Sequence, residues 1–275
     1  MTTSEPDFLY ANAPLIEVIA ELRWDLIGLA SMPGAGIDPL FEILRPRISE
    51  RLASLGFNSV ERVSPEQVPI EFVGGAPVFR FRQGPNQWPL HQLGPGLFTS
   101  NIVPPYDGWQ AFRGVISAGH AALIDSLPTG VSDLKGLKPK LTYIDGFTGK
   151  HEYSPASNFV ANQLNIGFSL PEALLSDSAA AERDIQSTFN LSFALKSPPA
   201  ARLSVACAQG LKDGNNALLM ELNTIATSAF AATNADDLLS WMDAAHVMLH
   251  DAFEHLTSDS LKKVMGPKLP VRPST

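Results

Sequence analysis

Apolar and polar side chains alternate along residues 14–24 of the chain. Successive side chains of a strand point to opposite faces, so this period of two predicts a half-buried strand. The side expected to be buried carries Ile16, Val18, Leu22 and Trp24.

Apolar residues then recur at helical spacing in two stretches. The first helix is predicted to have Asp38 as its N-cap and Pro39 as its first residue, and to end at Gly56. The second is predicted to be capped by Asp107 and to stop before Pro128.

Short extended runs surround the second helix. Residues 78–82, 89–93 and 97–103 precede it, and residues 137–147 follow it. The Gly94-Pro95-Gly96 sequence permits a tight reversal, so the three runs before the helix predict a meander.

Residues 148–183 are rich in Ser, Ala, Asn and Pro, which places a subdomain boundary near Thr148. A short helix is predicted at 157–164, and alternation predicts antiparallel strands at 185–195, 203–211 and 217–227. Asn234 is the predicted N-cap of the longest helix, which runs to Leu256, and 257–264 forms one further turn or short helix. The apolar face of the long helix is expected to comprise Leu238, Met242, Leu249, Phe253 and Leu256.

These elements predict an α+β protein. Residues 1–148 form one subdomain of order β-α-β-β-β-α-β, and residues 149–275 form a second of order β-β-β-α. Each has an antiparallel meander sheet covered by amphipathic helices, because a sheet with one apolar face has to bury that face against another layer.

Composition is that of a cytoplasmic globular protein. Of 275 residues, 45% are hydrophobic and 17% charged, enough for a large core and too little charge for disorder. No apolar run approaches the length of a membrane span, and the N-terminus lacks the basic and apolar regions of a secretory signal. Cys207 is the single cysteine, so no internal disulfide or zinc ribbon is expected.

A net charge of −8 and a pI near 5.2 disfavour nucleic-acid binding. The basic side chains dense enough to consider are those of Arg45, Arg47, Arg51, Arg80 and Arg82. These arginines are interpreted as lying on solvent-exposed faces of the protein rather than at a nucleic-acid site.

Several segments resemble a sporadically distributed bacterial and archaeal protein family of unknown function and about this length. The resemblance is carried by Pro14-Leu15-Ile16-Glu17-Val18, Glu21-Leu22-Arg23-Trp24, Gln92-Leu93-Gly94-Pro95, Asn101, Tyr106, Trp109, Tyr143-Ile144-Asp145 and Phe253-Glu254-His255-Leu256-Thr257. The chain departs from the family at Thr142, where an Arg is frequent, and at Glu221 and Asn223, where an acidic pair is frequent. The resemblance implies a prokaryotic origin and implies no activity.

Nucleotide and hydrolase motifs are missing from the sequence. Gly34 and Gly36 begin a dinucleotide-binding pattern, but Pro39 stands where its third glycine belongs. No phosphate-binding loop and no nucleophile elbow occur, and no cofactor is expected.

Three side chains spaced four residues apart on the long helix are metal candidates: His246, His250 and Glu254. Val247 stands where a zinc protease has its Glu, and the stripe lies at the edge of the apolar face. The three are therefore interpreted as residues at the edge of the apolar face whose polar ends reach solvent, rather than as metal ligands.

A polar pocket is predicted from His91, Asn101, Tyr106 and Asp145, because strand ends and the loops beside them are where sites are assembled. Cys207 is in register with apolar residues and is expected to be buried and inert. Tyr106, Trp109 and Phe112 have helical spacing, which favours a core role over stacking on a flat ligand.

Two classes of function stay open. The favoured one is a non-enzymatic interaction or regulatory protein that self-associates, as a dimer, through its sheet edges. The alternative is a small-molecule-binding protein or a hydrolase without a recognisable motif, with a cavity under the helix that runs from Asn234 to Leu256.

Overall fold

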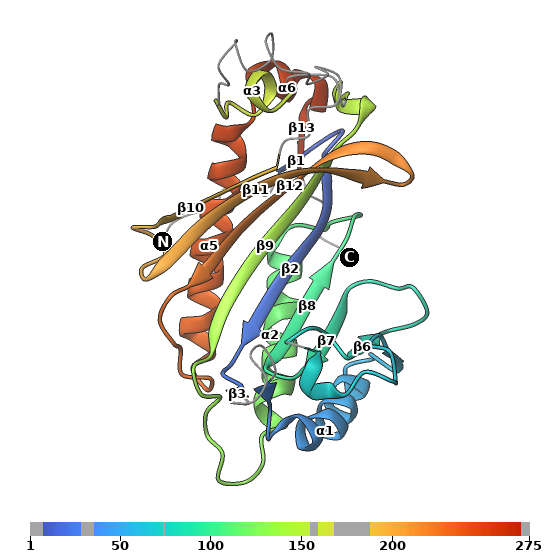
Figure 1. The fold of residues 1–275 in the computed structure, drawn as a ribbon, viewed down its shortest axis with the longest axis vertical. Coiled ribbons are helices and arrows are strands. Elements are labelled where there is room, and N and C mark those ends of the chain that lie inside the picture. Colours follow the sequence, from blue (N-terminus) through green and yellow to red (C-terminus); the bar gives the residue numbers. More distant parts are fainter. Residues whose placement is uncertain (1–7, 29–35, 74, 155–158, 168–187, 271–275) are drawn as a thin grey trace, which may run out of the picture.

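A computed structural model describes residues 8–28, 36–73, 75–154, 159–167 and 188–270. Its main feature is a nine-stranded antiparallel sheet, of order β10-β11-β12-β9-β2-β8-β7-β6-β5 (Figure 1). The strands are β2 (Leu15–Arg23), β5 (Ser59–Arg62), β6 (Phe79–Arg82), β7 (Leu90–Gly94), β8 (Leu97–Ile102), β9 (Lys138–Phe147), β10 (Phe189–Ala194), β11 (Ala201–Lys212) and β12 (Asn215–Ala226).

Three helices cover one face of this sheet. They are α1 (Phe41–Ser54), α2 (Trp109–Asp125) and α5 (Ala235–Leu256). Helix α5 packs against β9 and β12, α2 packs against β8, and α1 packs against α2. The other face carries polar side chains such as Lys140, which forms ion pairs with Glu21 at 3.1 Å and with Glu221 at 3.7 Å. The predicted α+β class with antiparallel sheets is confirmed.

The two halves of the chain share this sheet. Strand β9 lies between β2 and β12, with Tyr143 opposite both Val18 and Leu222. The hydrogen-bonded ladder therefore runs without a break from one half to the other, whereas the division at residue 148 stays a prediction.

Small elements complete the fold. They are β1 (Phe8–Tyr10), β3 (Ile27–Gly28), β4 (Gly36–Ile37), η1 (Ile70–Phe72), η2 (Gly149–His151), α3 (Phe159–Gln163), α6 (Asp259–Met265) and β13 (Lys268–Pro270). Strand β1 pairs antiparallel with β13, so segments from near the two ends of the chain meet beside α5. This pairing builds one wall of the site described below.

Two predicted helix starts are wrong. Helix α1 begins at Phe41, and Asp38 accepts hydrogen bonds from the backbone of Leu40 and from the Trp24 indole instead of capping the helix. Helix α2 begins at Trp109, and Gly108 rather than Asp107 occupies its N-cap position. Asn234 is the N-cap of α5, as predicted, and accepts from the amide of Asp237.

A bulge in β2 changes which residues are buried. The register with β9 shifts between Leu15 and Glu17, so Leu15 is buried and Ile16 is only half-buried. Simple alternation placed Ile16 on the buried side, but the extra residue of a bulge reverses the alternation before it.

Strand β10 differs from the predicted half-buried strand. It is the edge strand of the sheet, and Leu191 and Phe193 are each 50% exposed. An edge strand has one neighbour, and the helices lie over β9, β12 and β8 rather than over β10. Ile185, the predicted start of this strand, lies outside the described residues.

Candidate functional site

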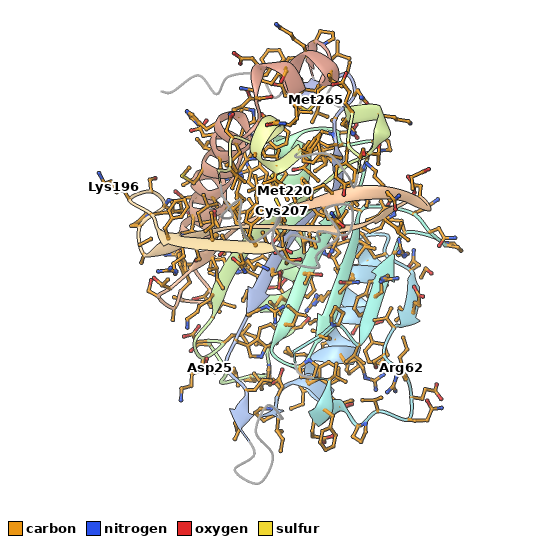
Figure 2. All side chains as sticks on the ribbon, turned by 45° about the horizontal axis from the view of Figure 1, so that its top comes forward. Asp25, Arg62, Lys196, Cys207, Met220 and Met265 are labelled. Carbon is orange, nitrogen blue, oxygen red and sulfur yellow. The ribbon has the colours of Figure 1, made fainter. Side chains whose placement is uncertain are left out.

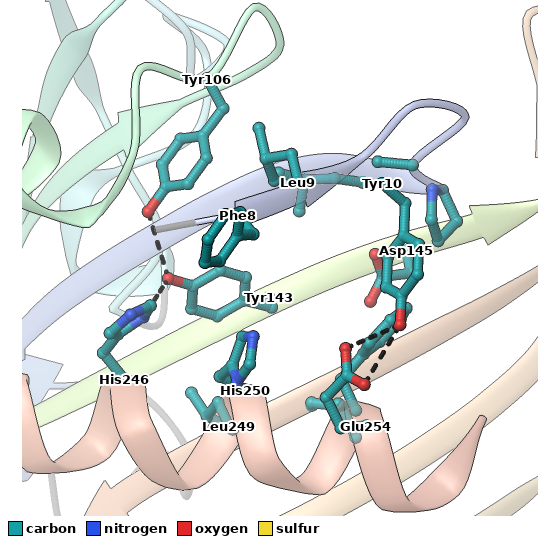
Figure 3. Close-up of a pocket in the computed structure, with 15 residues that line it drawn as sticks. Phe8, Leu9, Tyr10, Tyr106, Tyr143, Asp145, His246, Leu249, His250 and Glu254 are labelled. Carbon is teal, nitrogen blue, oxygen red and sulfur yellow. Dashed lines mark hydrogen bonds between the residues drawn. The ribbon is translucent and has the colours of Figure 1, made fainter. Parts of the chain in front are cut away.

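A pocket lies between the C-terminal half of α5, strand β9 and strand β1 (Figure 3). Its cavity volume is about 90 Å³. The lining residues are Phe8, Leu9, Tyr10, Ala13, Pro14, Leu15, Tyr106, Tyr143, Asp145, Leu222, His246, Leu249, His250, Phe253 and Glu254. Most of this lining is apolar or aromatic, with a few polar groups, which is the usual make-up of a small-molecule site.

Tyr143 is the centre of a hydrogen-bond chain at one end of the pocket. Its hydroxyl lies 2.8 Å from Nδ1 of His246 and 3.3 Å from the hydroxyl of Tyr106 (Figure 3). The His246 ring stacks on Trp109 with ring centres 4.5 Å apart, and the Trp109 indole N–H donates to Asp243 at 2.8 Å. The imidazole is thus held from two sides, so its orientation is fixed by α2 and β9 together.

Asp145 is the buried carboxyl of the pocket. It lies two residues after Tyr143 on β9, opposite Met220, and therefore on the face of the sheet that the helices cover. The residue is 4% exposed, and no other described residue forms a hydrogen bond or ion pair with its side chain. Burial raises its pKa from 3.8 to about 7, although the charge of Lys212 acts in the opposite direction.

A second carboxyl, Glu254, lies at the other end of the pocket and is fully engaged. The Tyr10 hydroxyl donates to both of its oxygens at 3.0 and 3.1 Å, and Lys268 and Lys262 lie at 3.1 and 3.6 Å. Burial alone would raise the pKa of Glu254, but these hydrogen bonds and positive charges outweigh it, so the pKa is lowered. Burial and Glu254 both raise the pKa of Tyr10. The cluster ties β1, β13 and α6 to α5.

The structure brings two of the four predicted pocket residues together. Tyr106 and Asp145 line the pocket, whereas Asn101 lies on the polar face of the sheet and donates to Glu17 at 2.7 Å. His91 lies in the core, with its Nδ1 3.0 Å from the Ser100 hydroxyl, and its burial lowers its pKa to about 4.

The three metal candidates share one side of α5 and all line the pocket. Their contacts do not converge on one point, because the His246 and His250 rings are 6.4 Å apart and Glu254 is held by Tyr10 and two lysines. Within the described parts of the chain, no group of three or more His, Cys, Asp or Glu side chains could hold a metal ion.

Cys207 is buried on β11, the strand next to the edge strand β10. It pairs in register with Met220 of β12, and Figure 2 labels both residues. Burial raises the pKa of its thiol to about 12. The thiolate is therefore not accessible near neutral pH, as expected for a structural cysteine.

Four of the five arginines considered for nucleic acid make separate contacts within the fold. Arg45 lies over the Phe79 ring, Arg47 donates to the carbonyl of Leu127, and Arg82 donates to that of Gln87. Arg80 lies 3.5 Å from Glu61. Each of these four has its own local contact within the fold.

Sequence reasoning missed Tyr10, Tyr143 and the β1 wall as parts of the site. Alternation on β9 carried a usable signal: Leu141, Tyr143 and Asp145 share one face, and a carboxylate on an otherwise apolar face needs an explanation. The three-residue strand β1 carried none, because it is too short for a period to show.

No family model, no curated protein and no solved structure matches this chain. The family resemblance therefore stays a prediction. Among the helices that the structure describes, none is both long and apolar enough to cross a membrane.

Proposed function

We propose that the protein binds a small organic molecule in the pocket between α5, β9 and β1. One observation carries this proposal: the Asp145 side chain is buried at the wall of an apolar cavity and has no hydrogen-bond partner among the described residues. A polar group that is largely removed from water and lacks a partner costs up to roughly 1 to 3 kcal/mol, so its presence in a native structure needs an explanation, and a ligand that completes its hydrogen bonds is one.

The walls of the pocket support the same proposal. Leu222 and Leu249 are buried at its floor, and Tyr143 presents a hydroxyl whose position is fixed by His246. Apolar walls supply affinity, and a few oriented polar groups supply specificity.

A fragment screen by ligand-observed NMR tests the proposal. Leu9 lines the pocket, and its register partner Leu269 on β13 does not. Leu9→Trp should fill the cavity, and Leu269→Trp is the matched control. We expect fragments that bind the wild type and Leu269→Trp to lose binding to Leu9→Trp. If no fragment binds the wild type, or if fragments bind Leu9→Trp as well as they bind the wild type, the pocket is not a binding site.

We also propose that the protein self-associates as a dimer through β10. This strand ends the sheet, and Leu191 and Phe193 on it are half exposed. An edge strand with apolar side chains offers both unpaired backbone groups and apolar area to a second copy.

A further inference from the structure

We propose that the pocket selects a small organic cation, an amine with a compact apolar body, and that Asp145 is its anionic partner. This inference rests on the proposed function and names the class of ligand.

The lining contains two carboxyl groups, the imidazoles of His246 and His250, and neither Lys nor Arg. Glu254 is already neutralised by Lys262 and Lys268. Asp145 has no ion pair among the described side chains. The positive charge of Lys212 acts on Asp145, but the Lys212 ammonium donates its hydrogen bond to the Pro14 carbonyl at 3.2 Å. When Asp145 is ionised, the uncompensated charge inside the pocket is therefore negative.

An ammonium group compensates the negative charge of Asp145 better than other ligand groups do. An isolated buried carboxylate is costly, and a cation that donates hydrogen bonds to it offsets that cost. A ligand carboxylate or phosphate would meet no Lys or Arg in the lining and would add repulsion from Asp145. Amines without an acidic group are thus preferred over amino acids and phosphate esters.

Aromatic rings around the pocket favour the same class. Phe8, Tyr10, Tyr106, Tyr143 and Phe253 all line it. Faces of aromatic rings attract cations by about 0.5 to 2 kcal/mol each, more when water is excluded. Such rings can hold an ammonium group and its apolar substituents at the same time.

Size and donor set argue against a metal cation and against a large ligand. The cavity volume is about 90 Å³, which suits a body of a single ring or a short chain. A calcium ion takes six to eight oxygen ligands. Asp145 is the one uncommitted carboxyl that the described lining supplies.

Two pairs of probes that differ only in charge test the inference. The pairs are benzylamine with benzyl alcohol, and n-butylamine with 1-butanol, titrated by calorimetry or NMR at pH 8. We expect at least one amine to bind the wild type at least tenfold more tightly than its alcohol. Asp145→Asn should abolish this preference, and Asp251→Asn, which removes a charge from the exposed side of α5, should keep it.

The possible results separate the two proposals. Equal binding of amine and alcohol to the wild type would overturn the proposed preference for a cation, and so would a preference that survives in Asp145→Asn. Either result would leave the proposed small-molecule site in place. Neutral fragments that bind where neither amine does also overturn the cation and leave the site standing. If no probe and no fragment binds, both proposals fail. Circular dichroism of Asp145→Asn confirms folding, and the comparison within the wild type needs no variant.

Discussion

Tyr143 on β9 and His246 on α5, 103 residues apart in the sequence, are joined by a 2.8 Å hydrogen bond between the phenol oxygen and the imidazole Nδ1. This contact fixes α5 over the sheet at the edge of the pocket. Tyr143→Phe is expected to remove this hydrogen bond and to destabilise the protein by about 1 kcal/mol. Urea unfolding measures the change.

Tyr106→Phe is the control for that variant. The Tyr106 hydroxyl lies 3.3 Å from Tyr143, a longer contact, so its removal should cost less. A larger loss in Tyr106→Phe than in Tyr143→Phe would show that the contact to α5 is not the important one.

The carboxyl of Asp145 should make the protein less stable as the pH rises. Its pKa in the folded protein is about 7, above the ordinary 3.8, so between these values the folded state holds a proton that the unfolded state lacks. Stability from this group is greatest below about pH 4 and falls until about pH 7. Because one pKa unit corresponds to about 1.4 kcal/mol, the rise from 3.8 to about 7 corresponds to roughly 4 kcal/mol in total.

Unfolding of wild type and Asp145→Asn at pH 4.5 and pH 8 checks this sign. The variant should gain stability relative to the wild type at pH 8 and gain little at pH 4.5. Buried His91, His120 and His151 have lowered pKa values and act in the opposite direction, so the difference between the two proteins is the quantity to compare. A difference that does not change with pH would contradict the raised pKa.

Truncation to Ala at three positions on α5 should destabilise the protein in the order of their burial. Leu249 is 1% exposed, and its truncation to Ala should cost about 2 to 5 kcal/mol. Phe253 is half-buried against the core and the Tyr10 ring, so Phe253→Ala should cost less, roughly 1 to 3 kcal/mol. His250 is exposed, and His250→Ala should stay within about 0.5 kcal/mol. Chemical denaturation that placed His250→Ala beside Leu249→Ala would show that this side of α5 is docked differently.

Sedimentation at micromolar concentration tests self-association through β10. We expect a dimer for the wild type and a monomer for Leu191→Lys with Phe193→Lys, because two charges oppose burial of the strand. Leu211→Lys changes an exposed leucine on β11 and should leave the dimer intact. A wild type that sediments only as a monomer would reject the dimer.

Elements with a clear local period were predictable. The apolar spacing on α5 and the cap at Asn234 define that helix, and alternation along β9, β11 and β12 defines those strands, because both patterns reflect contacts within a few residues. Of the site, Asp145 and Tyr106 could be named as candidates from their positions near a strand end and a helix start.

Long-range packing decided the rest. The sequence placed His91, Asn101 and Asp145 near one another, but their strand faces differ: His91 points into the core, Asn101 lies on the polar face, and Asp145 lies under α5. A one-residue bulge buried Leu15 in place of Ile16, and the pairing of β1 with β13 formed one wall of the pocket. Such relationships depend on which distant segments pair and on which face of the sheet each helix packs. The local pattern of a chain determines its helices and strands, whereas contacts between residues far apart determine where a buried carboxyl such as Asp145 meets a cavity.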